Sequence, residues 1–161
     1  MTQLTIQDAF DLAVRHHKSG ELREAERLYR QVIARHPDHA VALHFLGLIA
    51  GGDGRHELAV ELIGRAIALE PRSAETHFNF GIALSSAGRL DDAIAAFGRV
   101  IELNPGLPEA HGNLANVLRK KGLLDDAIAA FGQAIALRPD YADAHNNLGE
   151  ALRTKGQVDE A

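Results

Sequence analysis

The sequence predicts an all-α protein, a right-handed superhelix (solenoid) of antiparallel helix pairs. Proline, glycine and alanine each recur along the chain at a constant step of 34 residues. They stand at Pro37, Pro71, Pro105 and Pro139; at Gly20, Gly54, Gly88, Gly122 and Gly156; and at Ala25, Ala59, Ala93, Ala127 and Ala161. A fixed period of this length is typical of stacked copies of one supersecondary unit. With the proline placed at position 32, the repeats are 6–39, 40–73, 74–107, 108–141 and a partial 142–161.

Each repeat is expected to form two helices joined by a short turn, as 108–141 illustrates. Its apolar residues follow a 3.6-residue period on both sides of Gly122. Glycine ends the first helix there because it accepts the left-handed conformation. Asp125 and Asp126 are expected to open the second helix, where acidic residues act as caps and interact favourably with the helix dipole. Pro139 ends that helix, since proline disfavours helix at the residue before it.

A small residue in the first helix alternates with a large one in the second. Position 8 is small in every repeat and position 24 is large in the four complete ones. The small residues are Ala13, Gly47, Gly81, Ala115 and Gly149, and the large ones are Tyr29, Ile63, Phe97 and Phe131. We expect each large side chain to pack against the small residue of its own repeat.

The two ends of the repeat array give further expectations. Thr5 is expected to cap the first helix. In the last repeat we expect a helix over 142–155, with Leu148 and Leu152 on an uncovered apolar face. Only 158–161 would remain of its partner helix, which is too short to be stable. The chain is therefore expected to continue past residue 161.

This pattern resembles the tetratricopeptide repeat (TPR) family over residues 6–161. Members of that family have 34-residue helix pairs with small residues at positions 8 and 20, an aromatic residue near 24 and proline at 32. The resemblance implies a single solenoid domain over 1–161 that binds other proteins. Position 4, often aromatic in the family, instead holds Ala9, Leu43, His77, His111 and His145.

HGNLANVLRKKG and AHNNLGEALRTKGQ are also similar to repeats in the N-terminal superhelix of protein O-GlcNAc transferases and their bacterial relatives. In that family an asparagine at position 6 holds peptide backbone on the concave wall. The matching residues here are Asn79, Asn113 and Asn147, while the first two repeats have Asp11 and Phe45. The similarity covers repeats only, so the transferase activity is not implied.

Composition narrows the function classes. The net charge of −5 argues against a nucleic-acid partner, which usually requires a clustered basic face. There is no cysteine, so no disulfide framework is expected. No signal peptide and no apolar run of about 18 residues are evident. The expectation is a cytoplasmic protein with no membrane partner.

No motif in the sequence predicts catalysis, a metal or a cofactor. His77, His111 and His145 recur at one position, but helices pack about 8–10 Å apart, so three rungs cannot converge on one ion, and we expect packing roles. His36 and His39 have the spacing of a metal clip but lie in a turn between repeats. The chain is therefore not expected to be an enzyme, unless it is part of a larger glycosyltransferase.

The remaining candidate is a surface stripe on the first helices. Positions 2, 6, 9 and 13 fall within about 60° of one another and face away from the core, and stacking aligns them into a concave groove. The candidate peptide-binding residues are Asn79, Asn113, Asn147, Asn116, Glu75, Glu109, Asp143, Phe45 and Leu48. The carboxylates are expected to favour basic partner residues. Phe45 and Leu48 either take an apolar residue or are covered by the first helix pair.

The function predicted from these observations is a protein–protein interaction module or scaffold. It would hold an extended peptide or a helix in the concave groove. The alternative is the substrate-recognition region of a glycosyltransferase similar to protein O-GlcNAc transferase, with its catalytic domain outside this chain. A merely solvated stripe is the simpler interpretation. Asparagine is a poor helix former, however, and solubility alone does not require it at one repeated position.

Overall fold

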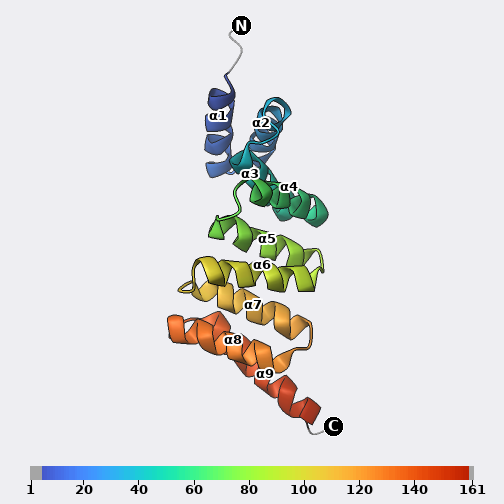
Figure 1. Cartoon of the computed structure of the whole chain (residues 1–161), viewed down its shortest axis with the longest axis vertical. Helices are drawn as coiled ribbons and strands as arrows, with labels where there is room; N and C mark the ends of the chain where they lie inside the picture. The colour runs from blue at the N-terminus through green and yellow to red at the C-terminus, as the bar shows by residue number, and fades with distance from the viewer. Residues whose placement is uncertain (1–4, 160–161) are drawn as a thin grey trace. The chain divides into compact units, whose positions relative to one another are not determined.

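The computed structural model describes residues 5–159, which form nine α-helices and no strand (Figure 1). The helices are α1 (Ile6–Lys18), α2 (Leu22–Arg35), α3 (Ala40–Gly52), α4 (His56–Leu69), α5 (Ala74–Ser86), α6 (Leu90–Leu103), α7 (Pro108–Lys120), α8 (Leu124–Leu137) and α9 (Ala142–Asp159). They divide into two compact units, residues 1–76 and 77–161, whose boundary falls within α5. The all-α prediction is confirmed.

Helices pack in sequence order within each unit. In the first unit α1 packs on α2, α2 on α3 and α3 on α4. In the second unit α6 packs on α7, α7 on α8 and α8 on α9. The pairs α1–α2, α3–α4 and α7–α8 are the expected antiparallel pairs of single repeats, joined by short turns (Figure 1). None of the described helices has the length and apolar character that crossing a membrane requires.

Four turns inside the repeats use glycine as the sequence predicts. Gly20, Gly54, Gly88 and Gly122 have φ angles of 79°, 76°, 76° and 83°. In this left-handed region a residue without Cβ avoids strain. The prediction is wrong for the fifth glycine, because α9 runs through Gly156 to Asp159. Glycine permits the turn but does not force it. Without a second helix packed alongside, continued helix gains one backbone hydrogen bond for each residue it fixes.

Of the two predictions about helix caps, the one for Thr5 is confirmed and the one for Asp125 and Asp126 is wrong. Thr5 caps α1, because its Oγ1 accepts from Asp8 N at 3.1 Å while Asp8 Oδ2 accepts from Thr5 N at 3.2 Å. Asp125 and Asp126 do not cap α8, whose N-cap is Leu123 with no side-chain hydrogen bond. They lie in the first turn, where the helix dipole still favours them.

The first-turn aspartates have another role in the second unit. Asp91 pairs with Lys121, and Asp125 pairs with Lys155. In both pairs the aspartate is at position 18 and the lysine at position 14 of the following repeat. The same ion pair thus joins consecutive repeats twice.

Small and large residues fit together as predicted. Tyr29, Ile63, Phe97 and Phe131 are all at most 1% exposed. A Cβ atom built on Gly47 would lie 2.6 Å from Ile63, and one on Gly81 would lie 2.8 Å from Phe97. A Cβ on Gly149, where no second helix follows in the described residues, would meet nothing within 4 Å.

Two position-4 histidines bond to the turn that precedes their helix. His111 Nε2 donates to Pro105 O at 3.3 Å, and His145 Nε2 donates to Pro139 O at 2.8 Å. These carbonyls belong to the position-32 proline of the repeat before. The two imidazoles therefore tie one repeat to the next.

Candidate functional site

The predicted stripe in the second unit follows α7 from its first turn to its last. Glu109, Asn113, Asn116 and Lys120 occupy positions 2, 6, 9 and 13. The first three are half buried and Lys120 is exposed. Positions 2 to 13 span about 16 Å of helix axis at 1.5 Å per residue. The stripe is therefore long enough to contact several residues of a bound segment.

Two of the predicted asparagines already make hydrogen bonds within the protein. Asn113 Nδ2 donates to Glu109 O at 2.9 Å, one turn back in α7. Asn147 Nδ2 donates to Asn116 Oδ1 at 3.0 Å, which links α9 to α7. An amide nitrogen carries two hydrogens and its oxygen two lone pairs, so each side chain keeps further bonding capacity. Asn79, on α5, is half buried.

Asn113 and Asn116 line a hollow of about 260 Å³, which we call the α5–α7 hollow. Its other lining residues include side chains from the end of α5 and the end of α7. The full lining is Ile82, Ser85, Ser86, Phe97, Asn113, Asn116, Val117, Arg119 and Lys120. Five of these, Ile82, Ser86, Asn113, Asn116 and Lys120, are at stripe positions. The structure thus brings part of the predicted stripe together around one concave site.

Glu109 has an ion-pair partner within its own repeat. The expectation was a carboxylate that favours basic residues of a partner, but Glu109 pairs with Arg138 of the same repeat. This guanidinium holds the pKa of Glu109 below its usual value. Arg138 also lies 5.0 Å from the ring centroid of Tyr141. Asp143, in the first turn of α9, remains exposed.

The sequence carried no signal for the Glu109–Arg138 pair. Position 31 holds His36, Glu70, Asn104 and Arg138 in the four complete repeats. A contact made in one repeat only produces no periodicity from which it could be inferred.

In the first unit, Phe45 is half buried and contacts the first helix pair, as in the second of the two alternatives. Its ring stacks on Tyr29 of α2 at 5.7 Å and 17°, and meets His17 of α1 edge-on at 5.3 Å. It packs against the buried core of that unit. Leu48, one turn further along α3, is half buried.

A second hollow, of about 200 Å³, lies in the first unit and is called here the α3–α4 hollow. It is lined by Ala40, Val41, His44, Phe45, Ala66, Glu70, Ser73, Glu75 and Thr76. Of the predicted site residues, Phe45 and Glu75 line this hollow. Burial lowers the pKa of His44, while the charge of Glu75 opposes that shift.

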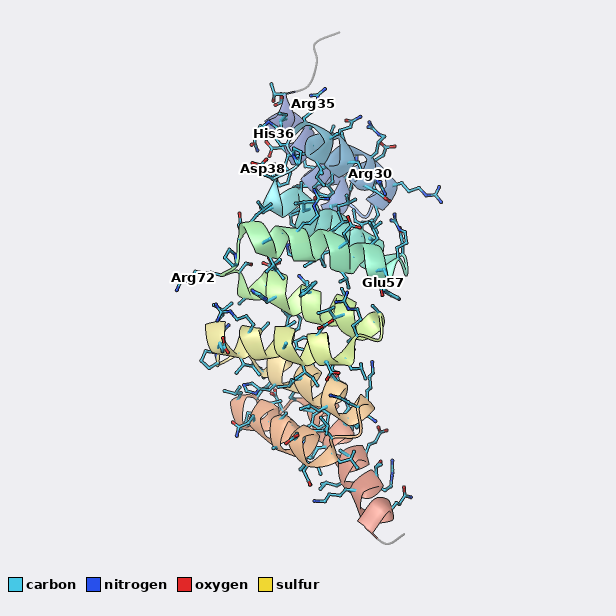
Figure 2. All side chains as sticks on the ribbon, turned by 45° about the vertical axis from the view of Figure 1, so that its right-hand side comes forward. Arg30, Arg35, His36, Asp38, Glu57 and Arg72 are labelled. Carbon is cyan, nitrogen blue, oxygen red and sulfur yellow. The ribbon has the colours of Figure 1, made fainter. Side chains whose placement is uncertain are left out.

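The turn between α2 and α3 does not form the metal clip that its spacing suggested. His39 Nδ1 accepts from Ala42 N at 3.2 Å and so caps α3. His36 Nδ1 lies 4.0 Å from Asp38 Oδ1, and Figure 2 shows both near Arg35 at this turn. In the described part of the chain no group of three or more His, Asp or Glu residues could hold a metal ion.

Comparison with family models decides the family. The tetratricopeptide repeat model matches residues 10–74, 46–108 and 78–131, and a second TPR repeat model matches 115–156. The chain belongs to the tetratricopeptide repeat family. A TPR fold of this kind is typical of protein–protein interaction modules and resembles non-enzymatic scaffolds.

Solved TPR structures superpose closely on this chain. A crystal structure of MamA has a TM-score of 0.89 at 28% identity, covering 96% of this chain and 85% of that one. A second MamA structure has a TM-score of 0.85 at 28% identity, covering 99% and 90%. The APC/C hetero-tetramer Cut9–Hcn1 shares the fold, with a TM-score of 0.82 at 22% identity, covering 92% of this chain and 30% of that chain. A search of curated proteins found no match.

Proposed function

We propose that this TPR protein binds an extended segment of a partner protein along the stripe of first-helix residues. In the second unit the segment would lie against α7 and its neighbours. The observation that carries the proposal is the α5–α7 hollow, because it gathers stripe positions of two successive repeats around one concave site. Extended concave surfaces along stacked repeats are the usual binding surfaces of such arrays.

The half-buried asparagines suit main-chain recognition. A carboxamide can donate to a peptide C=O and accept from its N–H. Asn113 and Asn116 are held in place by their bonds to Glu109 O and Asn147. These two side chains therefore lose less conformational entropy on binding than freely rotating side chains would. Contacts of this kind ignore the partner's side chains, which allows several partners.

The test uses the full chain and peptides selected on it from a displayed random library. The triple variant Asn79→Ala, Asn113→Ala, Asn147→Ala should weaken the binding of several unrelated peptides by similar amounts. The expected loss of binding free energy is about 0.5–1.5 kcal/mol for each hydrogen bond removed. Gln133→Ala is the matched control, since Gln133 is an exposed amide on α8 outside the stripe. Unchanged affinities for the triple variant, with its helical content intact, would show that the asparagines are only solvated.

The alternative of a glycosyltransferase substrate-recognition region has no support in the comparisons. The matched structures are TPR proteins, and the similarity of the repeats to those of O-GlcNAc transferases stays a resemblance of sequence. The interaction module is the function that the fold and the hollow favour.

A further inference from the structure

The end of α7 carries three successive basic residues whose surroundings differ. Arg119 pairs with Glu150 of α9 at 3.1 Å, and Lys121 pairs with Asp91 of α6. Lys120, between them, has a 3.4 Å contact with Ser85 Oγ, near the outer limit for a hydrogen bond. Its ammonium thus has a weak neutral partner, whereas both neighbours are neutralised by carboxylates.

The α5–α7 hollow around Lys120 is rich in hydrogen-bond donors. Arg119 lines it, and the Nε of that guanidinium is buried with no acceptor. Asn147 donates a hydrogen bond to the side-chain oxygen of Asn116. The side-chain N–H groups of Asn116 therefore remain available as donors to a ligand. Ser85 and Ser86 add two hydroxyls. No carboxylate is among the lining residues in the described part of the chain.

A buried donor without an acceptor destabilises the folded state. A positive group next to such donors favours an anionic acceptor. Among the described residues that line this hollow, Ile82 is the one large apolar side chain that is strongly exposed, at 42%. The site therefore offers charge complementarity for one acidic group and an apolar contact one turn away on α5.

We propose that the α5–α7 hollow binds a side-chain carboxylate, Asp or Glu, of the partner segment, with an apolar residue of the same segment on Ile82. Lys120 supplies the charge, and Asn116 and the serine hydroxyls supply directional donors. A carboxylate fits better than a phosphate because a single cation is available there. The second cation, Arg119, is already neutralised by Glu150. This inference rests on the proposed function, since it names the chemistry of the bound segment.

The experiment uses the 161-residue chain and compares peptides selected from a displayed random library on the wild type, on Lys120→Met and on Lys121→Met. Lys121→Met is the matched control, because Lys121 is the next residue but pairs with Asp91. Wild type and Lys121→Met should enrich peptides with an acidic residue near an apolar one, and Lys120→Met should not. A third selection on Lys120→Glu should enrich basic residues at the same place.

The best wild-type peptide is then remade with Asn, and with phosphoserine, in place of its acidic residue. Loss of the carboxylate should weaken binding to wild type by about two- to fivefold, as for an exposed ion pair, and leave binding to Lys120→Met unchanged. The effect should shrink with added salt.

Each other outcome overturns part of the argument. Peptides without acidic enrichment, or an Asn effect that persists in Lys120→Met, would remove the carboxylate site and leave the interaction module standing. Tighter binding of the phosphoserine peptide would assign the hollow to phosphate. If no variant selects any peptide, both this inference and the proposed function fall.

Discussion

Phe97 occupies the space that a side chain at Gly81 would need, since a Cβ atom there would lie 2.8 Å from its ring. The two residues join α5 to α6 within the second unit. Gly81→Ala should therefore destabilise the protein by about 1–3 kcal/mol, because overpacking a rigid ring forces backbone or rotamer shifts. Urea denaturation followed by circular dichroism measures this change.

The control for Gly81→Ala lies on the opposing helix. A Cβ atom on Gly98 of α6 would meet nothing within 4 Å. Gly98→Ala should be neutral or stabilising, by up to about 1 kcal/mol, since alanine restricts the unfolded chain. Combining Gly81→Ala with Phe97→Leu should recover part of the loss. If Gly81→Ala alone were as stable as wild type, the close packing would not be a constraint on this sequence.

Ala127 tests the same principle in the last complete repeat. It is 0% exposed in the core of the second unit, whereas its neighbour Asp126 is exposed in the first turn of α8. Ala127→Leu should cost about 1–3 kcal/mol, and Asp126→Leu should cost less, mainly through the helix dipole. Thermal melts of both variants decide the comparison, and equal melting temperatures would place the packing face elsewhere.

Glu26 and Arg55 predict an acid-sensitive contact in the first unit. Glu26 accepts from Arg55 at 2.8 and 3.0 Å and also from Arg30, which Figure 2 shows at the surface of α2. These guanidinium groups lower the pKa of Glu26 from 4.5 to about 2. A lowered pKa means that the folded state holds the carboxylate ionised. Its stabilisation is complete above pH 4.5 and is lost as the pH falls towards 2.

Glu26→Gln should accordingly lower the free energy of unfolding at neutral pH by about 1 kcal/mol, a value reduced by solvent screening. The difference from wild type should narrow below pH 4.5. Urea titrations at a series of pH values measure it. A constant difference across that range would mean that the charge of Glu26 contributes nothing.

The buried histidines predict a second pH dependence. Burial lowers the pKa values of His17 and His44 from 6.5, and both rings contact Phe45. Since their neutral forms are favoured by folding, this contribution to stability is complete above pH 6.5 and decreases as the pH falls below it. His17→Phe keeps an aromatic ring and removes the titration. Its stability should fall less between neutral and mildly acidic pH, and an unchanged pH profile would exclude His17 as a cause.

The periodic part of the structure was predictable from sequence, and the non-periodic part was not. The step of 34 residues sufficed for the helix pairs, the left-handed glycines and the fit of Gly81 against Phe97. Gly156 was mispredicted because its turn depends on a helix that must pack afterwards, not on the glycine alone. The pairing of Glu109 with Arg138 occurs in one repeat and leaves no pattern. Helix geometry was sufficient to predict which residues lie on the stripe. The availability of Arg119 and Lys120 as donors could not be predicted, because it depends on where the surrounding side chains lie.

The ion pairs of the second unit also bear on how such a chain can change length. Asp91–Lys121 and Asp125–Lys155 are the same contact one repeat apart, and so are His111–Pro105 and His145–Pro139. Residues 90–98 and 124–132 are identical, LDDAIAAFG. Unequal recombination between the corresponding stretches of the gene would insert or remove one whole repeat and leave these aspartate–lysine and histidine–carbonyl contacts intact at the new boundary. The Glu26–Arg55 pair in the first unit is not repeated 34 residues later, where Val60 and Arg89 stand at the same positions, so a repeat inserted there would not reproduce it.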